Sequence, residues 1–384
     1  MIVIYFDNSA TTKILPEVLD TYVQVSNNYW GNPSSLHGLG EEAFNLLNQS
    51  RQQIANLLKV RANEIIFTSG GSEGDNWIVK GVAMQKQRFG KHIITSSIEH
   101  PAIYNAMRQL EQNGFEVTYL PVTNEGLVSI SALKKAIRKD TILVSIMAVN
   151  NEIGTIQPLE EITNVLKQYP SIIFHVDAVQ ALGKGLEKRI FGNDRIDFAS
   201  FSGHKFHAPR GTGFIYKRSG KKICPLINGG GQEQNLRSGT ENVPGIASMA
   251  KALRILLSNE EEYNQREHKV LNVILNHINK FKNVRTFYKN EKNHVPTILC
   301  FAILGVRGET IVHAFEEYGI YISTTSACSS KKGMPASTLK AMKIPDEISN
   351  CAVRISLNGF NTVEEAEEFN NVFDKLYDRF KKIN

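Results

Sequence analysis

Through the first two thirds of the chain, short runs of apolar and β-branched residues alternate with longer segments of helical spacing. The run at 141–149 is almost continuously apolar, as expected of a strand buried on both faces of a parallel sheet. The alternation predicts an α/β fold with a mainly parallel central sheet and crossover helices. Further strands are predicted at 64–68, 92–96, 115–120, 171–177 and 196–202, with helices such as 73–86, 101–113 and 129–139 between them.

The last third of the chain has a different pattern. A charged segment at 258–282 has apolar residues at helical spacing, and an amphipathic helix begins at Thr362. Short strands are predicted between them, at 297–304 and 351–357. We therefore expect a large domain over 14–260 and a small α+β domain made of 1–13 and 261–384. The cleft between two such domains is a favoured place for a small-molecule site.

Composition excludes several classes of protein without indicating a chemistry. Of the 384 residues, 42% are hydrophobic and 21% are charged, which is typical of globular proteins. The apolar start of the chain is too short for a secretion signal, and no stretch of about 18 apolar residues predicts a membrane span. The net charge of +6 comes without a basic patch interleaved with aromatic residues, so direct nucleic-acid binding is not expected.

The number and spacing of the cysteines indicate the cellular compartment of the protein. Four cysteines in a chain of this length cannot form a disulfide framework, and no two of them form a CxxC pair. We therefore expect no structural zinc cluster and no other metal site. Free thiols are typical of a reducing compartment, so we expect a cytoplasmic protein.

Residues able to bind or react follow several of the predicted strands, at the sheet edge where α/β proteins bind their ligands. The small-residue turn at 69–73 opens a helix and could hold a phosphate. His100, Asn151 and Asp177 each follow or end a strand, and Gln180 comes shortly after Asp177. Taken singly, each has an ordinary alternative, as a plain turn, a helix cap or a surface side chain.

The segment 200–205 gives the sharpest chemical indication. It places Ser202, His204 and Lys205 in a glycine-containing turn directly after a strand. A partly desolvated lysine beside other donors has a lowered pKa, which favours Schiff-base chemistry. The alternative is a solvated loop lysine. Because Asp177 ends the preceding strand, both side chains could point into one cleft.

Together these segments carry a resemblance that covers nearly the whole chain. In this order and spacing the chain resembles the cysteine desulfurases of the pyridoxal-phosphate-dependent class V aminotransferase family, in particular the bacterial sulfur-mobilising ones. The resemblance implies fold type I, with a large cofactor domain and a small domain. The motifs that carry it are DNSATT, GNPSSLHG, TSGGSEGDN, EHPA, NNEIGTIQP, HVDAVQALGK, SFSGHK, GGGQEQNLRSGTENV, TSACSS and VRISL.

The resemblance implies a set of residues that bind pyridoxal 5'-phosphate. Lys205 would carry the cofactor, and Asp177 would pair with its protonated pyridine nitrogen. His100 would stack on the ring and move protons. Gln180 and Asn151 would lie beside the phenolic oxygen. The phosphate would be bound by Gly71, Ser72, Ser202 and His204.

The resemblance also implies substrate contacts and a second subunit. Arg354 would bind the carboxylate of L-cysteine, since a guanidinium suits that group, and Asn151 would lie near it. Asn32 would line the entrance of the pocket. Thr240 would reach the phosphate in the partner subunit, which implies a homodimer. Without the other motifs, Arg354 would be interpreted as a surface arginine and Thr240 as a helix N-cap.

Cys328 is the cysteine for which the resemblance implies a reaction. It lies among small and polar residues, whereas Cys300 and Cys351 lie in apolar strands and Cys224 has no supporting motif. Lys331 and Lys332 nearby favour the nucleophilic thiolate. An exposed loop cysteine is otherwise most often an incidental thiol.

The implied reaction converts L-cysteine to L-alanine and leaves the sulfur on Cys328 as a persulfide. The persulfide would pass to an acceptor protein, either an iron–sulfur cluster scaffold or a tRNA-thiolation protein. A selenocysteine lyase, a class V aminotransferase and a non-catalytic assembly protein remain as alternatives.

The chain departs from the family pattern at two places. Gly71 and Ser72 stand where the family usually has Ala and Thr, and Ala208 stands where glycine is usual. If position 208 requires a positive φ, alanine adds backbone strain there. We expect both departures to affect cofactor affinity and neither to remove a catalytic group.

Overall fold

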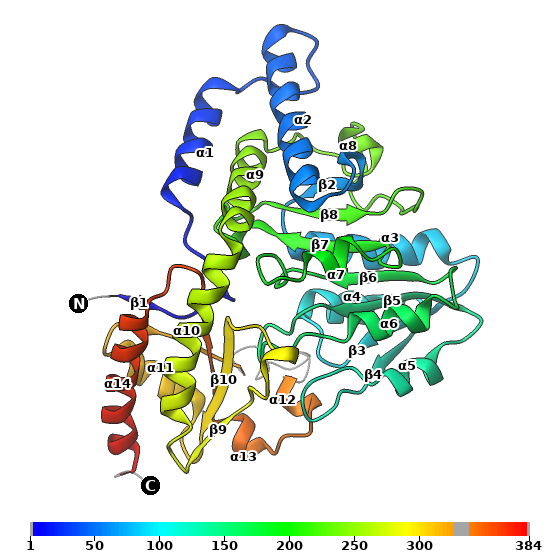
Figure 1. Cartoon of the computed structure of the whole chain (residues 1–384). Coiled ribbons are helices and arrows are strands. Elements are labelled where there is room, and N and C mark those ends of the chain that lie inside the picture. Colours follow the sequence, from blue (N-terminus) through cyan, green and yellow to red (C-terminus); the bar gives the residue numbers. More distant parts are fainter. Residues whose placement is uncertain (1–2, 326–337, 382–384) are drawn as a thin grey trace.

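A computed structural model describes residues 3–325 and 338–381 of the chain. Its largest feature is a seven-stranded sheet with the order β2-β8-β7-β6-β5-β3-β4 (Figure 1). Strands β3 to β7 are parallel, and β8 is antiparallel to both of its neighbours. The strands are β2 (Ile65–Thr68), β3 (His92–Ser96), β4 (Glu116–Leu120), β5 (Thr141–Met147), β6 (Ile173–Asp177), β7 (Phe198–Ser202) and β8 (Gly213–Lys217).

The predicted fold class is confirmed, with one strand missed. The sheet is mostly parallel, and the six strands predicted for this part of the chain are present, with ends shifted by a few residues. Strand β8 was not predicted because its short apolar run lies between glycine and basic residues, a composition typical of loops. Only its pairing with β2 and β7 makes this segment a strand.

Both faces of the large sheet are covered, which explains the continuous apolar strands. Neighbouring residues such as Ile173 and Phe174 point to opposite faces and belong to two different apolar clusters. One face packs against α3 (Gly71–Lys86) and α4 (Pro101–Gln112). The other face packs against α5 (Ile130–Ala136), α6 (Leu159–Leu166), α7 (Glu187–Phe191) and α9 (Val243–Ser258).

A second sheet forms from the C-terminal part of the chain. It is antiparallel, with the order β12-β13-β10-β9. Its aromatic core contains Phe301 on the sheet, Phe315 on one helix and Phe369 on another. The elements are β9 (Val284–Thr286), β10 (Ile298–Ile303), β12 (Ser323–Thr324), β13 (Ala352–Ser356), α10 (Glu260–Ile278), α11 (Gly308–Glu316) and α14 (Val363–Lys381).

The N-terminal arm joins this second sheet region. Strand β1 (Ile4–Tyr5) pairs in parallel with β11 (Ile320–Tyr321), and Asp7 bridges to Ser356 at the end of β13. Helix α10 begins two residues after α9 ends, with no linker between them. The division into domains at residue 260 stays a prediction.

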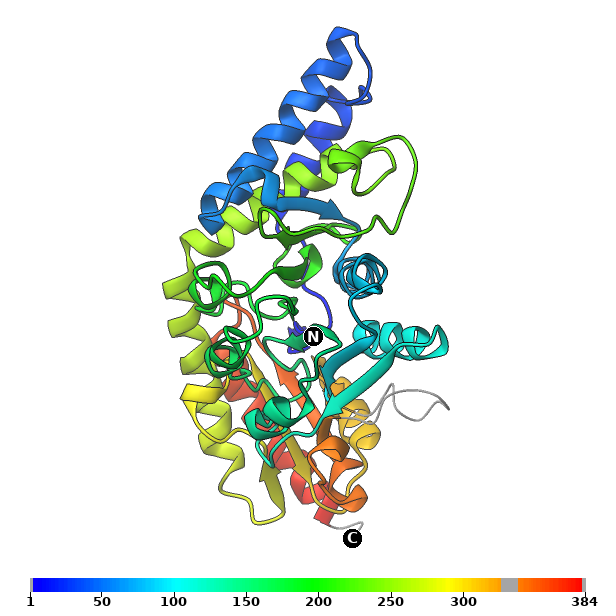
Figure 2. The same cartoon turned by 90° about the vertical axis from the view of Figure 1, so that its right-hand side faces the viewer.

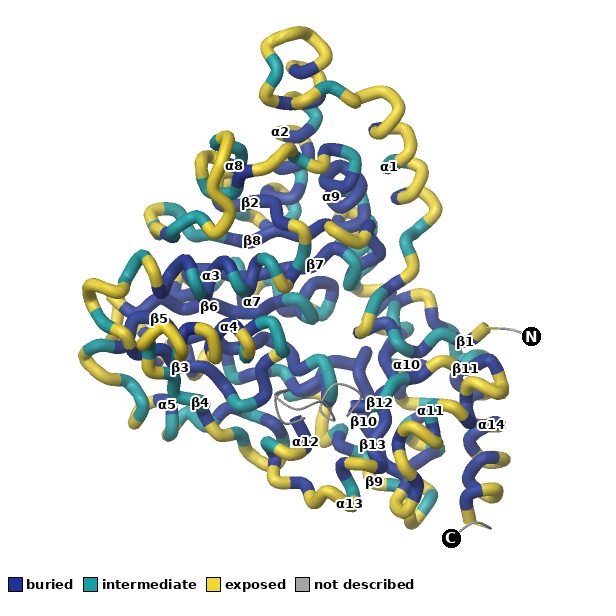
Figure 3. The backbone as a smooth tube through the Cα atoms, turned by 180° about the vertical axis from the view of Figure 1, so that it is seen from behind, coloured by how far each residue is buried: buried dark blue, intermediate teal, exposed yellow. Residues whose placement is uncertain are grey.

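A hairpin of two helices projects from the molecule. Helices α1 (Pro16–Asn28) and α2 (Gly38–Leu58) pack against α9 and extend beyond the large sheet (Figures 1 and 2). The outer part of this hairpin is mostly exposed, whereas the strands of the large sheet are buried (Figure 3). The remaining short elements are η1 (Ala62–Glu64), η2 (Gly203–Lys205), η3 (Glu291–Asn293), α8 (Gln232–Asn235), α12 (Thr338–Ala341) and α13 (Asp346–Ser349). None of the helices within the described ranges has the length and hydrophobicity needed to cross a bilayer.

The turn α8 has an unusual backbone that a buried ion pair stabilises. Glu233, Gln234 and Asn235 all have positive φ, between 47° and 64°, a region that L-residues avoid. Both carboxylate oxygens of Glu233 accept from the guanidinium of Arg51, at 2.6 and 2.7 Å. Glu233 also accepts from the N–H of Phe67 in β2 at 2.8 Å. This pair anchors the glycine-rich loop that leads to Thr240.

Replacing Glu233 with alanine is expected to destabilise the protein by about 3–5 kcal/mol, because it leaves the Arg51 charge buried without a partner. Urea unfolding of the variant measures the loss. Glu317→Gln is the matched control, since its pair with Arg379 is more than half exposed on both sides and should not change the midpoint measurably. An equal effect of the two substitutions would contradict a special role for the buried pair.

Candidate active site

One cleft of about 680 Å³ brings most of the predicted site residues together. It lies at the carboxyl ends of β5, β6 and β7, where α/β sheets bind ligands, and β12 and β13 close its other side. The predicted residues that line it are Gly71, Ser72, His100, Asn151, Asp177, Gln180, Ser202, His204, Lys205 and Arg354.

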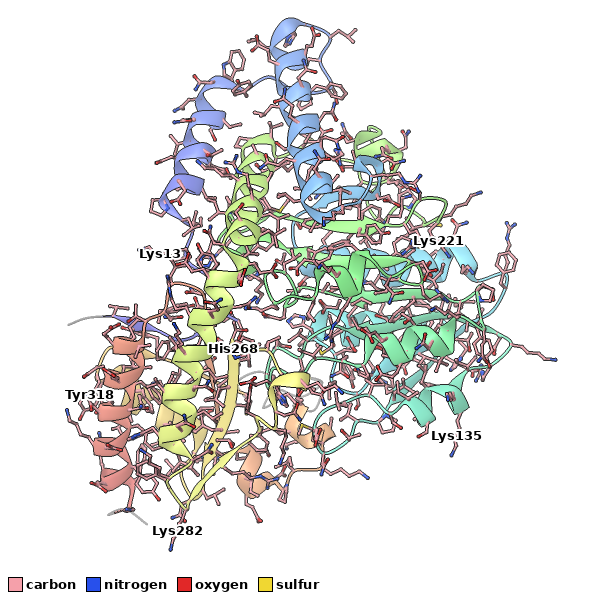
Figure 4. The ribbon with its side chains drawn as sticks, in the orientation of Figure 1. Lys13, Lys135, Lys221, His268, Lys282 and Tyr318 are labelled. Carbon is pink, nitrogen blue, oxygen red and sulfur yellow. The ribbon has the colours of Figure 1, made fainter. Side chains whose placement is uncertain are left out.

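Lys205 differs from most lysines of the chain in its surroundings. Lys135 and Lys282 are exposed on the outer surface (Figure 4), whereas Lys205 is half-buried in the cleft. Its Nζ donates to the carbonyl of Ser9 at 2.5 Å and to that of Ala10 at 2.9 Å. Burial, together with the nearby Arg354 charge, lowers the pKa of Lys205 to about 8. Its amine is therefore available as a nucleophile and base near neutral pH.

Asp177 supplies the negative charge in the cleft. Its Oδ1 accepts from the N–H of Val179 at 3.0 Å. Burial raises the pKa of Asp177 to about 6, while that hydrogen bond and the Lys205 charge oppose the rise. The carboxylate is therefore ionised at neutral pH and suits a cationic ring nitrogen.

His100 is held as a neutral imidazole with a defined tautomer. It is the N-cap of α4, and its Nδ1 accepts from the N–H of Ala102 at 3.1 Å. Desolvation by the surrounding protein, together with Lys205, lowers the pKa of His100 to about 4. The proton of the neutral ring is then on Nε2. His204 is similar, with its pKa lowered to about 4 and its Nδ1 placed 3.2 Å from Oγ1 of Thr11.

The turn before α3 leaves its backbone uncovered toward the cleft. Gly70 has φ +151°, and a Cβ atom added there would lie 3.4 Å from Oγ of Ser202. The backbone N–H groups of the first turn of α3 and the hydroxyls of Ser72 and Ser202 can therefore approach one anion. This cradle, with the amine of Lys205 and the carboxylate of Asp177, fits pyridoxal 5'-phosphate.

The two departures from the family pattern have different outcomes. A Cβ atom on Gly71 would lie 2.6 Å from Cγ2 of Val179, so glycine is required opposite this valine. The strain expected at Ala208 was wrong, because Ala208 is not among the residues with positive φ. Its neighbour His207 has φ 65° instead. There, Oγ1 of Thr12 accepts the His207 N–H at 2.8 Å, and the ring Nδ1 lies 2.8 Å from the carbonyl of Lys13.

Arg354 lies in the middle of β13 and is already paired. Its Nη2 donates to Asp7 Oδ1 at 2.7 Å, and its Nη1 donates to the carbonyl of Asn151 at 2.9 Å. Its Nε–H is buried and has no acceptor in the part of the chain that the structure describes. The ion pair with Asp7 was not predicted, although the DNSATT motif was noted.

Two residues with predicted roles, Asn32 and Thr240, do not line this cleft. Asn32 lies in the connection between α1 and α2, and Thr240 lies in the loop after α8; both are exposed and neither lines the cleft of its own chain. The expectation that Asn32 lines the pocket entrance therefore does not hold within one chain, because the hairpin extends away from the large sheet. Cys328 lies outside the described residues. The roles of all three stay predictions.

Two further acids, which the motifs do not predict, lie around Asp177. Asp75 on α3 is buried, lines the cleft and accepts from Oγ of Ser200. Glu99 is buried, and its Oε1 accepts from Oγ of Ser96 at 2.6 Å and from the Met147 N–H at 3.1 Å. Burial and the Asp177 charge raise the pKa of Asp75 well above its usual range. Burial, followed by the same charge, raises that of Glu99 to about 8. Glu99 is therefore largely protonated at neutral pH, burial favours the protonated form of Asp75, and Asp177 keeps the charge.

The comparisons with known proteins agree with this geometry. The profile of the family described as aminotransferase class-V matches residues 4–369. A protein of Lactobacillus delbrueckii subsp. bulgaricus, named a NifS/IcsS protein homolog, is 55% identical over 381 residues, 99% of each chain. The cysteine desulfurase IscS of Dictyoglomus turgidum is 39% identical over 99% of this chain and 96% of its own. The solved structure of a NifS-like protein has a TM-score of 0.90 at 38% identity, covering 99% of this chain and 100% of that one.

Replacing Glu99 with glutamine is expected to flatten the dependence of stability on pH. The folded protein raises the pKa of Glu99 from 4.5 to about 8, so between these values the folded state holds a proton that the unfolded state has released. The stabilisation is present at low pH and is lost as the pH rises through that window. The amide that replaces the carboxyl group does not titrate in this range. The variant should therefore not show this loss of folding stability, which is on the order of a few kcal/mol in the wild type.

Urea unfolding of both proteins at several pH values between about 5 and 8.5 measures this difference. Glu116→Gln is the control, because the Glu116 side chain is 69% exposed and should leave the slope unchanged. If Glu99→Gln also keeps the wild-type slope, Glu99 is ionised in the folded protein.

Proposed function

The chain belongs to the aminotransferase class-V family, and on that premise we propose that it is a pyridoxal-phosphate-dependent cysteine desulfurase. It converts L-cysteine to L-alanine and transfers the sulfur to Cys328. The observation that carries the proposal is the convergence of Lys205, Asp177 and Arg354 on one cleft from three separate elements. The full-length similarity to a protein named cysteine desulfurase supports the substrate.

The residues of the cleft would hold the cofactor at both ends. When bound, pyridoxal phosphate supplies an electron sink that stabilises negative charge on the substrate Cα. Lys205 would hold it covalently, and Asp177 would pair with its ring nitrogen. Its phosphate would lie on the cradle at the start of α3. Asn151 and Gln180 line the same cleft and suit the phenolic oxygen.

Lys205 and His100 are suited to moving protons. With a pKa of about 8, Lys205 has a substantial fraction of free amine near neutral pH and can take a proton from the substrate Cα. His100 is neutral and presents its Nε2–H, so it can donate a hydrogen bond without adding a positive charge beside Lys205.

Arg354 would bind the substrate carboxylate. Its guanidinium lies in the cleft, paired with Asp7, whose side chain is 20% exposed. A substrate carboxylate can take over the donors that face the cleft or share the guanidinium with Asp7. The hydrogen bond from Arg354 to the Asn151 carbonyl keeps the guanidinium beside Asn151.

Cys328 would accept the sulfur. The last described residues before it, Ser323, Thr324 and Thr325, line the cleft. Cys328 is the third residue after Thr325 in the sequence, which supports this role. Its thiolate would attack the substrate sulfur, forming the S–S bond of a persulfide as the C–S bond breaks. We propose that an acceptor protein then receives the sulfur, and that a reducing cytoplasm keeps the thiol free.

The purified protein is expected to form alanine and, with a reductant, sulfide from L-cysteine. Cys328→Ala should lower sulfide formation more than about 100-fold, because it removes the nucleophile. Cys224→Ala is the matched control, a half-buried free cysteine outside the cleft. The absence of alanine from the wild type would refute a desulfurase. Full turnover by Cys328→Ala would favour an aminotransferase.

We further propose that the active protein is a homodimer in which the α1–α2 hairpin contacts a second copy of the chain. Large exposed hydrophobic side chains gather on this hairpin, and Trp30 is 70% exposed. Clusters of this kind mark interaction surfaces. The exposed Thr240 supports the same arrangement, because its role implies a neighbouring subunit. The cluster consists of Leu19, Val23, Tyr29, Trp30, Leu36, Leu39 and Phe44.

Light scattering after size-exclusion chromatography tests the dimer. The wild type is expected to have twice the mass of one chain, and Trp30→Glu should weaken association at least about tenfold by placing a charge in an apolar contact. Phe89→Glu is the control, an aromatic residue that is 75% exposed beyond the end of α3 and away from the hairpin. A monomeric wild type would exclude the proposal, and a dimer unaffected by Trp30→Glu would place the interface elsewhere.

A further inference from the structure

A second, smaller cavity lies on the other side of Lys205 from the substrate cleft. Its volume is about 30 Å³. Ser9, Gln180 and Lys205 line both this cavity and the cleft, so these residues form the wall between them. Its other walls come from the segment after β6, from α10 and from the residues that flank β10 and β13.

Three residues that line this cavity each have a buried side-chain oxygen atom without a partner. These atoms are Oγ of Ser9, Oγ1 of Thr297 and Oε2 of Glu267, and no group in the described ranges forms a hydrogen bond with any of them. Ser9, Thr297 and Glu267 are 6%, 2% and 4% exposed. Leaving such groups unpaired costs about 1–3 kcal/mol each, so three in one small cavity indicate a shared polar occupant.

The size and lining of the cavity identify the occupant as water. A water molecule needs at least about 10–15 Å³ of such space and two to four polar partners, so this cavity has room for about two. Ser9 lines the cavity and has an unpartnered Oγ, and its main-chain carbonyl accepts from Lys205. Ser9 thus connects the lysine to the interior of the cavity.

Glu267 is a titratable residue in the wall of the cavity. Its Oε1 lies 4.0 Å from Nζ of Lys184, across the junction between α10 and the segment after β6. Burial raises the pKa of Glu267 to about 7, opposed by Lys184 and assisted by Glu260. The titratable and charged groups that line the cavity or act on this pair are Lys184, Glu187, Lys205, His207, Glu260 and Tyr263.

We propose that ordered water molecules in this cavity carry protons between Lys205 and Glu267, which makes Glu267 and Thr297 positioning residues for the proton steps of Lys205. The proposal rests on the proposed function, in which Lys205 takes a proton from the substrate. Lys205 then gives a proton to the adjacent water, and water gives one to the Glu267 carboxylate, which becomes a neutral acid. The reverse transfer resets both groups, and no electrons leave either residue.

The proton affinities of the two ends are matched. With pKa values near 8 and near 7, transfer from Lys205 to Glu267 is only slightly uphill, so it is reversible on the time scale of turnover. The ammonium group of Lys184 stabilises the negative charge that Glu267 carries when it is ionised.

A pair of substitutions at Thr297 tests the water site directly. Thr297→Ser keeps the hydroxyl, whereas Thr297→Val keeps the shape and removes it. In high-resolution crystal structures of the wild type and the serine variant, we expect ordered water bonded to Glu267 Oε2 and to the hydroxyl at position 297. The valine variant should lose at least one of these molecules. A dry cavity in the wild type overturns the proposal.

The proton path is tested by pH-jump kinetics of the cofactor-loaded protein, following the pH-dependent absorbance of the cofactor bound to Lys205. Thr297→Val and Glu267→Gln should each slow the relaxation about tenfold, whereas Thr297→Ser and the exposed control Glu262→Gln should match the wild type. Equal relaxation in all five proteins overturns the path.

Turnover gives an independent readout. The wild-type kcat should rise with pH through a pKa near 7 as Glu267 becomes ionised, below the rise near 8 that deprotonation of Lys205 gives. Glu267→Gln should lack the lower rise while its KM for cysteine is unchanged. A rise near pH 7 that Glu267→Gln retains contradicts the proposal. The crystal structures and the pH jump need no turnover, so they test the water path even if L-cysteine yields no alanine and the proposed function fails.

Discussion

The amine of Lys205 is held by two main-chain carbonyls, those of Ser9 and Ala10, and the rest of the site depends on that contact. These carbonyls belong to the arm Asp7–Thr12, which is bound to both halves of the molecule. At one end, the main-chain N–H and the side-chain amide of Asn8 both donate to the Ser356 carbonyl at the end of β13. At the other end, the N–H and hydroxyl of Thr12 donate to the His204 carbonyl. The arm therefore sets the position of the lysine between the two sheets.

The chemistry of the cleft depends on ionisable side chains that are buried and whose charges are only partly compensated by partners. Several carboxyl groups lie around Asp177 in a region of low dielectric, where they cannot all be ionised. Burial and the Asp177 charge raise the pKa values of Asp75 and Glu99, that of Glu99 to about 8, whereas the Asp177 carboxylate is stabilised by a backbone N–H and by Lys205. The same desolvation lowers the pKa of Lys205 and keeps His100 neutral. The carboxylate of Asp177, the amine of Lys205 and the neutral imidazoles of His100 and His204 are the groups of the cleft suited to the reaction.

The exposed parts of the structure have a different role from the cleft. The α1–α2 hairpin bears a cluster of exposed hydrophobic side chains, and the left-handed turn α8 is held by the Arg51–Glu233 pair. A second ion pair, the half-buried bidentate pair of Arg237 with Glu73, ties the same loop to the first turn of α3. The loop with Thr240 is thus fixed to its own phosphate cradle while its tip faces outward. This geometry is what a site shared between two copies of the chain requires.

The amino-acid sequence alone determined the α/β class, six of the seven strands of the large sheet, two of the four strands of the second sheet and ten of the residues that line the cleft. These depend on local periodicity and on short motifs, in which neighbouring residues carry the information. The tertiary structure decided the features that depend on contacts between segments far apart in the sequence. Strand β8 exists through its pairing partners, Gly71 is required by Val179, and Arg354 is paired with Asp7. The acids with raised pKa values and the cavity behind Lys205 also belong to this second group, because desolvation and unpaired oxygens arise only when the chain has packed.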